Sequence, residues 1–343
     1  MTDLKSRGGD EMPNIKVVIY GLGPIGAKMV QFLLSRRSFD IVGAVDIASD
    51  KIGKDIGEIA GMEKPYGVLI EANGAKVLEK AKPHVVVLTT TSILEKIKPQ
   101  IMEIIEHGVN VVSTCEELTF PWVTNPVIAK EIDNQAQQKG VSVLATGVNP
   151  GFLMDFLPLA VTAVCRQVDN ITVYRVQDAT NRRLSFQQKV GVGITINEFH
   201  ERVKKGALRH VGLTESMHMI ASKIGWHLGK TEDIIEPVVA EKRTFLKDKT
   251  IEKGDVLGVK QTGFGYVGQE VVITLNFIAA AGIDQSYDRI VVNGIPVVDM
   301  SIKNGINGDI ATCAMVMNAI PVVLQARPGL RTMADIEPVS CFL

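Results

Sequence analysis

Two adjacent glutamates, Glu116 and Glu117, are the residues of this sequence best suited to acid–base chemistry on a nitrogen-containing substrate. They follow an apolar run at residues 109–112, in the segment Ser113-Thr114-Cys115-Glu116-Glu117-Leu118. A carboxylate at such a place can hold an ammonium or iminium group and move its proton. Adjacent side chains cannot both point the same way, so the sequence leaves open which one acts. The alternative is an exposed pair of acids that opens a helix.

A second polar segment, Thr146-Gly147-Val148-Asn149-Pro150-Gly151-Phe152, follows the apolar run at residues 141–145 in the same manner. In a doubly wound fold, the ends of parallel strands are where ligands collect. We therefore expect Asn149 and Pro150 to contact a cofactor, and Gly151 and Phe152 to contact the substrate.

Three basic side chains are further candidates. His210 is predicted to orient the substrate or to shuttle protons, against the alternative of a packed or surface histidine near Arg209. Arg182 and Arg183 can bind a substrate carboxylate in bidentate geometry, against the alternative of solvated loop charges.

A glycine-rich turn, Gly21-Leu22-Gly23-Pro24-Ile25-Gly26, follows the β-branched run at residues 15–20 and opens an apolar helical pattern. Glycines at these spacings permit a tight turn, close approach of a pyrophosphate, and contact between helix and strand. Asp46 ends the next strand at the distance expected of the acid that binds the adenosine ribose. The motif predicts a dinucleotide site that favours NAD, with NADP possible because Lys51 and Lys54 lie just beyond Asp46.

A run of hydroxyl residues, Thr89, Thr90, Thr91 and Ser92, ends the apolar strand that begins at Val85. We expect the three threonines to contact the nicotinamide half of the cofactor. The alternative is an ordinary helix N-cap by Thr91 or Ser92.

Alternating strand and helix patterns position these groups. Apolar strands are expected at residues 15–20, 41–45, 85–89, 109–112 and 141–145, with helices at 25–34, 92–107 and 126–138. Strands that are apolar throughout predict an α/β fold with a doubly wound parallel sheet.

The pattern changes after Asn149. A helix is expected at residues 152–164, extended runs at 171–176, 236–242, 256–262 and 270–280, and a hairpin at 289–300 that turns at Asn293-Gly294. These runs predict a mixed or antiparallel sheet in a second domain. The helix at 310–324 should be bent or shortened at Pro321.

The predicted organisation is a polar extension at residues 1–11, a Rossmann domain at 12–148, a substrate and dimerisation domain at 149–305, and a closing helix and tail at 306–343 that pack back on the Rossmann domain. A sheet with one uncovered face predicts a homodimer.

Composition excludes several classes of partner. Thirty-seven basic and 38 acidic side chains leave no positive field for nucleic acid, so we expect no nucleic-acid partner. The longest apolar runs, such as residues 85–88 and 271–281, fall well short of the roughly 20 residues that a membrane helix requires, so we expect no membrane span. Four scattered cysteines, Cys115, Cys165, Cys313 and Cys341, argue against disulfides and a zinc site, so we expect no metal and a cytoplasmic location.

The sequence resembles the 2,4-diaminopentanoate dehydrogenases and the related native amine dehydrogenases. The resemblance lies in the glycine turn, in the segments at 113–118 and 147–152, in His210-Val211-Gly212-Leu213 with Glu215-Ser216, in Asn318-Ala319-Ile320-Pro321 and in Pro328-Gly329-Leu330. It implies NAD(P)-dependent oxidative deamination of an amine to a ketone and ammonia, with 2,4-diaminopentanoate giving 2-amino-4-oxopentanoate. It also implies that Glu117 or Glu116 acts on the substrate nitrogen.

Three alternatives stay open. Simple alkyl amines can be the substrates in place of a diamino acid. Dihydrodipicolinate reductases share the two-domain plan, but this chain lacks their His-His pair and has Asp178-Ala179-Thr180-Asn181 in place of their Asp-Ala-Pro-Ser-Gly run. A non-catalytic dinucleotide sensor is the third.

Overall fold

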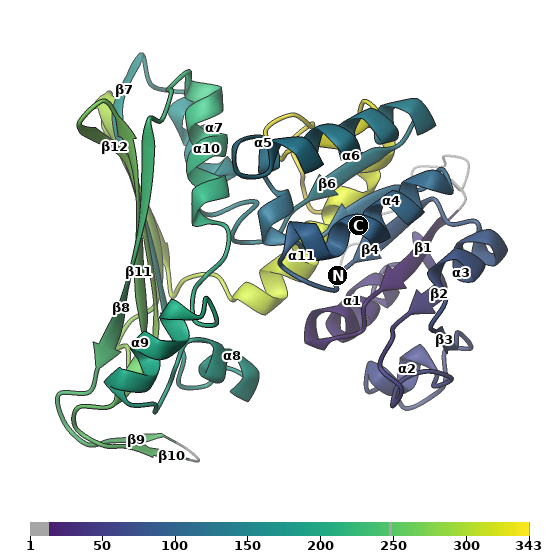
Figure 1. Ribbon diagram of the computed structural model, residues 1–343, viewed down its shortest axis with the longest axis horizontal. Helices are drawn as coiled ribbons and strands as arrows, with labels where there is room; N and C mark the ends of the chain where they lie inside the picture. Colours follow the sequence, from purple (N-terminus) through teal and green to yellow (C-terminus); the bar gives the residue numbers. More distant parts are fainter. Residues whose placement is uncertain (1–13, 247–248, 343) are drawn as a thin grey trace, which may run out of the picture.

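A seven-stranded parallel sheet forms one of the two halves of the molecule, and its last strand comes from the C-terminal end of the chain (Figure 1). The computed structural model describes residues 14–246 and 249–342, and the extension expected at residues 1–11 lies outside them. The strand order is β15-β6-β5-β4-β1-β2-β3, which is the Rossmann order with one strand added at the edge. The strands are β1 (Ile15–Tyr20), β2 (Phe39–Val45), β3 (Ile70–Glu71), β4 (Val85–Leu88), β5 (Asn110–Ser113), β6 (Ser142–Ala145) and β15 (Gly329–Arg331).

Helices cover both faces of this sheet, which confirms the predicted doubly wound α/β fold. On one face α1 (Pro24–Leu34) and α11 (Gly308–Gln325) share an apolar cluster with the strands. On the other face α3 (Gly74–Ala81), α4 (Leu94–Glu106) and α6 (Pro126–Lys139) do the same. The short helices are α2 (Ile56–Ile59), α5 (Pro121–Thr124) and the 3₁₀ turn η1 (Glu116–Leu118). Because both faces are covered, β4 and β6 are buried along their whole length.

A six-stranded mixed sheet forms the second half, in the order β14-β13-β7-β12-β11-β8. Only β7 and β12 pair in parallel, and the other neighbours are antiparallel, as the predicted mixed sheet allows. Its strands are β7 (Gln167–Asp178), β8 (Lys230–Val239), β11 (Val256–Val267), β12 (Glu270–Ala280), β13 (Tyr287–Ile295) and β14 (Val298–Lys303). A separate hairpin consists of β9 (Thr244–Leu246) and β10 (Lys249–Ile251).

The helices of this half lie on the side of the mixed sheet that is turned toward the parallel sheet (Figure 1). They are α7 (Phe156–Thr162), α8 (Leu184–Lys189), α9 (Ile196–Lys204) and α10 (Leu213–Ile224). Gly263 of β11 lies against Leu213 and Met217 of α10, so Phe264 on the same strand faces the opposite side. No described helix covers that outer side (Figure 1).

The hairpin predicted at residues 289–300 is confirmed by the antiparallel pairing of β13 with β14, but its turn was placed wrongly. Asn293 and Gly294 lie inside β13, where they pair with β7 at a register shift, and the chain turns only after Ile295. Neither residue has a positive φ, so the turn chemistry expected there does not apply. Gly294 instead permits close approach of the backbone, because a Cβ there would collide with the carbonyl oxygen of Gln167.

α11 is not shortened at Pro321, since it continues to Gln325. Its buried side chains, which include Val316 and Ile320, pack with α1 and the parallel sheet, and this tertiary burial outweighs the hydrogen bond lost at proline. Among the described residues α11 is also the one helix long and apolar enough to cross a membrane by length and composition. Its packing here is that of a core helix.

Candidate active site

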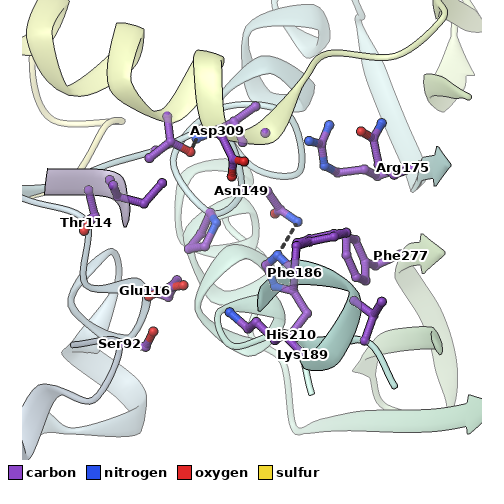
Figure 2. A pocket seen from close by; sticks show the side chains of 18 of the residues that line it. Ser92, Thr114, Glu116, Asn149, Arg175, Phe186, Lys189, His210, Phe277 and Asp309 are labelled. Atoms are coloured by element: carbon purple, nitrogen blue, oxygen red, sulfur yellow. Dashed lines mark hydrogen bonds between the residues drawn. The ribbon is translucent and has the colours of Figure 1, made fainter. Parts of the chain in front are cut away.

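A pocket lies between the two sheets, at the carboxyl ends of β4, β5 and β6 (Figure 2). Parallel strands all end at this edge, which is where a doubly wound fold binds ligands. One wall comes from the loops after these strands and carries Thr89, Thr90, Thr91, Ser92, Thr114, Glu116, Thr146, Asn149 and Pro150. The opposite wall comes largely from the mixed sheet and α8 and carries Arg175, Gln177, Arg182, Arg183, Phe186, Lys189, His210 and Phe277. The start of α11 also lines the pocket, with Asp309 and Thr312.

The glycine-rich turn has the backbone that a dinucleotide site requires. Gly21 has a φ of +97°, a conformation that favours glycine. A Cβ at Gly26 would collide with the carbonyl oxygen of Gly21, so the third glycine allows close contact of helix and strand. Around Gly23, in contrast, no described atom lies within 4 Å of the place that a Cβ would take. This open space fits a pyrophosphate, because it lies at the N-terminus of α1, which has no side-chain cap.

Pro24 opens α1, and Ile25 in its first turn lines the pocket. The pocket and the glycine turn are therefore continuous, so a dinucleotide can lie with its pyrophosphate at α1 and its nicotinamide in the pocket.

Asp46 is anchored beside the glycine turn. Its carboxylate accepts hydrogen bonds from the Leu22 amide at 2.7 Å and from the Ala48 amide at 2.9 Å, and it pairs with the Lys51 ammonium at 3.1 Å. Partial burial by itself would raise the pKa of Asp46, but these amides and Lys51 hold the pKa below its usual value. The acid is thus charged and held where the fingerprint expects a ribose contact.

The three threonines after β4 all line the pocket, and each hydroxyl is engaged by the protein. Thr89 donates to the carbonyl of Gly21 at 2.7 Å and so ties β4 to the glycine turn. Thr90 donates to the side chain of Gln100 at 2.6 Å, and Thr91 accepts from the amide of Ile93 at 3.3 Å. The N-cap position of α4 is Ile93, so neither Thr91 nor Ser92 is the helix cap.

Glu116 and Glu117 point in different directions. The 3₁₀ turn η1 has about three residues per turn, which separates consecutive side chains by about a third of a circle. Glu116 lines the pocket, on the same side as Ser92 and Thr114 (Figure 2). Glu117 does not line it, because its carboxylate accepts the amide of Leu94 at 2.8 Å and so caps the N-terminus of α4. The structure thereby brings one of the two predicted acids to the pocket and uses the other in the fold.

His210 lies in the pocket wall against Phe277, with ring centroids 4.4 Å apart. Burial, assisted by the charges of Lys189 and Arg175, lowers the pKa of His210 to about 3, so the ring is neutral. Its Nδ1 lies 2.8 Å from the carbonyl oxygen of Val211 and must carry the proton, which leaves Nε2 as an acceptor. A ring that is neutral near pH 7 argues against proton shuttling and favours the orienting role predicted for this residue.

Asn149 completes this arrangement. Its Nδ2 lies 3.3 Å from Nε2 of His210, as the dashed line in Figure 2 shows. Because Nε2 can only accept, the NH₂ group of Asn149 must be the donor, and the tautomer of His210 therefore fixes the orientation of the amide. Oδ1 of Asn149 is then a buried acceptor without a hydrogen-bond partner among the described residues.

The predicted carboxylate clamp, Arg182 and Arg183, lines the pocket but already has a carboxylate partner. Arg182 Nη2 lies 3.2 Å from Asp309 Oδ1, and Arg183 Nε lies 3.1 Å from Asp309 Oδ2. The side chain of Arg182 is only 11% exposed, so it is not a solvated loop charge. Asp309, in the first turn of α11, joins the two halves of the molecule through this contact.

Gly151 and Phe152, predicted to bind substrate, are not among the residues that line the pocket. Gly151 has a φ of +119°, and its amide donates to Asp155 Oδ2 at 2.7 Å. Phe152 packs against the core of the mixed sheet. Asp155 is fully buried and also accepts from Ser216 Oγ at 2.9 Å, so this carboxylate joins the loop that carries Asn149 to α10. Burial raises the pKa of Asp155, although its hydrogen bonds from the amides of Gly151 and Phe156 and from Ser216 oppose that effect.

Several pocket residues were missed from the sequence. Arg175 is 3% exposed and bonds to Asp288 at 2.8 Å and to the carbonyl of Ile306 at 3.1 Å. Alternation along β7 could have predicted this, because Arg175 follows Ile171 and Val173 at every second position and so lies on the same inward side of the strand. Lys189 and Asp309 carried no such signal, because both reach the pocket only through the packing of α8 and α11.

Comparison with known proteins places the chain in a family. Residues 152–343 match the family model of the 2,4-diaminopentanoate dehydrogenase C-terminal domain, and residues 15–116 match that of the dihydrodipicolinate reductase N-terminus. Over 337 residues the chain is 36% identical to a 2,4-diaminopentanoate dehydrogenase from Acetoanaerobium sticklandii, which covers 95% of this chain and 94% of that protein. This chain belongs to the 2,4-diaminopentanoate dehydrogenase family. The resemblance seen in its motifs and the predicted dehydrogenase class are confirmed.

Solved structures show how far this family's fold extends. An amine dehydrogenase from Mycobacterium smegmatis superimposes with a TM-score of 0.84 at 22% identity and covers 96% of this chain and 97% of its own. A dihydrodipicolinate reductase from Paenisporosarcina has a TM-score of 0.53 at 13% identity, with coverage of 92% and 96%. At these identities the likeness is one of fold.

Proposed function

We propose that this family member catalyses the NAD(P)-dependent oxidative deamination of 2,4-diaminopentanoate to 2-amino-4-oxopentanoate and ammonia, which runs in reverse as reductive amination. The observation that carries the proposal is the charge arrangement of the pocket, with Glu116 on one wall and a group of cationic side chains on the other. A diamino acid offers a nitrogen to Glu116 and a carboxylate to the cationic side chains. The 36% identical relative is named for this substrate, which supports the same choice.

Glu116 is proposed as the acid–base residue. When bound, the nicotinamide accepts a hydride from the carbon that bears the reacting amine. That nitrogen must be neutral when the hydride leaves, so the substrate ammonium must first lose a proton. Within residues 14–246 and 249–342 the Glu116 carboxylate has no ion pair, so it is available to take this proton. Once Glu116 has released this proton to solvent, the same carboxylate can take a proton from the water that adds to the iminium carbon, and it can give that proton to the nitrogen, which leaves as ammonia when the ketone forms.

Thr89, Thr90, Thr91 and Pro150 line the pocket and keep the cofactor contact expected from the sequence as their proposed role. Asn149, which was expected to contact the cofactor as well, is proposed instead to position the substrate, because its side chain is paired with His210. His210 and Asn149 form a neutral, hydrogen-bonded pair beside the pocket, which favours orientation over proton transfer. Arg182 and Arg183 stay candidates for a substrate carboxylate, with Asp309 as their partner before substrate binds.

Asp46 is proposed to bind the adenosine ribose and to favour NAD, because its charge repels a 2′-phosphate. Lys51 partly offsets that repulsion through its ion pair with Asp46, so we expect NADP to be used less efficiently rather than rejected. The ratio of kcat/KM for NAD to that for NADP tests this role. A wild type that prefers NADP strongly would contradict it, and Asp46→Ala should shift the ratio toward NADP.

Turnover of 2,4-diaminopentanoate, followed by the absorbance of the reduced nicotinamide, tests the proposed reaction. Simple alkyl amines and a dihydrodipicolinate-type cyclic imine are the comparison substrates. Activity confined to alkyl amines or to the imine contradicts the proposed substrate, and cofactor binding without turnover of any of them indicates a sensor.

A homodimer is proposed from the outer side of the mixed sheet. Phe264 and Tyr266 lie on that side, next to Ile234 of β8, which is 46% exposed. Burying such a face against its own copy is a common solution for a sheet covered by helices on one side. Light scattering tests the proposal, and a monomer contradicts it.

We also propose a cytoplasmic location. The four cysteines are free thiols, which is typical of proteins in a reducing compartment, and fractionation of cells tests the location.

A further inference from the structure

The cationic wall of the pocket contains arginines that are paired with carboxylates and one lysine, Lys189, that has no such partner among the described residues. Arg175 is paired with Asp288, and Arg182 and Arg183 share Asp309. Lys189, the last residue of α8, lines the same pocket but forms no ion pair or hydrogen bond with the described part of the chain. An incoming carboxylate would have to compete with Asp288 or Asp309 for the arginines, whereas the Lys189 ammonium needs no exchange of partners.

Lys189 stands close to the neutral pair of His210 and Asn149. Its charge acts on the His210 ring, and Figure 2 shows the two residues on the wall that faces Glu116 and Ser92. Lys189 is solvent-exposed, so a ligand that enters the pocket would remove water from an ammonium not yet neutralised.

Asn149 supplies a second unfilled interaction at the same place. Its Oδ1 is buried and lacks a partner among residues 14–246 and 249–342, and the tautomer of His210 prevents the amide from turning. A buried acceptor without a partner costs free energy unless a ligand supplies a donor. A cation and a carbonyl acceptor on either side of His210 match a carboxylate and an ammonium on adjacent atoms of one ligand.

We propose that Lys189 and Asn149 recognise the α-amino acid end of the substrate, with the Lys189 ammonium on the carboxylate and Asn149 Oδ1 on the 2-ammonium group, while Glu116 faces the amine that reacts. This inference rests on the proposed function and assigns its selectivity to two residues. Simple alkyl amines lack both groups, so they gain nothing from either contact.

Three substrates separate the two contacts. 2,4-Diaminopentanoate has both groups, 4-aminopentanoate lacks the 2-amine, and 2-aminopentane keeps the reacting amine but lacks both the 2-amine and the carboxylate. For Lys189→Met we expect the ratio of kcat/KM for 4-aminopentanoate to that for 2-aminopentane to fall about 10- to 100-fold, chiefly through KM. For Asn149→Ala the ratio for 2,4-diaminopentanoate over 4-aminopentanoate should fall by about 10-fold or more. Lys205→Met, at an exposed lysine after α9 and outside the pocket, is the matched control and should leave both ratios unchanged.

The outcomes distinguish this inference from the proposed function. A wild type that turns over 2-aminopentane but neither amino acid overturns both. A wild type active on 2,4-diaminopentanoate, with ratios unchanged in Lys189→Met, overturns only the inference. The same holds if Arg182→Met lowers the carboxylate ratio and Lys189→Met does not. Melting temperatures close to that of the wild type show that each variant is folded.

Discussion

Glu116→Gln and Glu117→Ala are expected to damage different properties of the enzyme, although the two residues are adjacent. Gln at position 116 keeps the size of the side chain but cannot take a proton from the substrate nitrogen. General acid–base residues contribute about 10²- to 10⁴-fold to turnover, so kcat should fall within that range. No hydrogen bond of the Glu116 side chain to the described residues is lost, so the melting temperature should stay close to that of the wild type.

Glu117→Ala should act on stability. It removes the 2.8 Å bond to the amide of Leu94 from a 13-residue helix whose N-cap, Ile93, offers no side-chain bond of its own. Loss of a capping bond costs about 1 kcal/mol, which corresponds to a melting temperature lower by roughly 2–4 °C. Glu117→Gln retains an acceptor oxygen and should lose less. Turnover by the folded Glu117→Ala enzyme should stay within about threefold of the wild type, since the side chain does not line the pocket.

Steady-state kinetics and differential scanning calorimetry on the same preparations measure both effects. If Glu117→Ala lost turnover by a hundredfold with an unchanged melting temperature, the assignment of the two glutamates would be reversed. If both Gln variants kept full turnover, neither carboxylate would be the base.

Other predictions address the cofactor site, the pH dependence of stability and the assembly. Gly23→Ala should leave the melting temperature unchanged, because Gly23 has an ordinary φ of −67° and open space around it, yet the Kd for NAD measured by calorimetry should rise at least about tenfold; an unchanged Kd would remove the pyrophosphate from this turn. Burial raises the pKa of Glu215 to about 7, above the usual value of 4.5, so its contribution to stability is complete below pH 4.5 and is lost as the pH rises through 7. Glu215→Gln should therefore gain about 3 kcal/mol relative to the wild type between pH 4.5 and pH 8 in urea unfolding, whereas a constant difference would contradict the burial argument. Phe264→Lys should convert the proposed dimer to a monomer in light scattering, and a dimer that persists would place the contact elsewhere.

Much of the fold could be predicted because its signals are local. β1, the glycine turn and α1 follow one another within residues 15–34, and the composition and spacing of each segment are sufficient to predict it. The doubly wound parallel sheet follows from the same alternation of strand and helix, and Asp46 lies where the fingerprint expects an acid. Errors arose where a local rule met a tertiary constraint: Asn293-Gly294 is a turn signal that β7 holds in a strand, and Pro321 is a helix breaker that the core keeps within α11.

The candidate site is divided in the same way between sequence and structure. Residue types and strand ends determined, from the sequence by itself, that a dinucleotide and a nitrogen-handling carboxylate meet at one edge of a sheet, because parallel strands must end together. Only the tertiary structure decided that Glu116 enters the pocket while Glu117 caps α4, that His210 stays neutral, and that Asp309 pairs with Arg183 from 126 residues away along the chain. Burial, charge pairing and the capping of helix ends depend on which distant segments contact each other in the folded chain. The spacing of residues along the sequence does not determine those contacts.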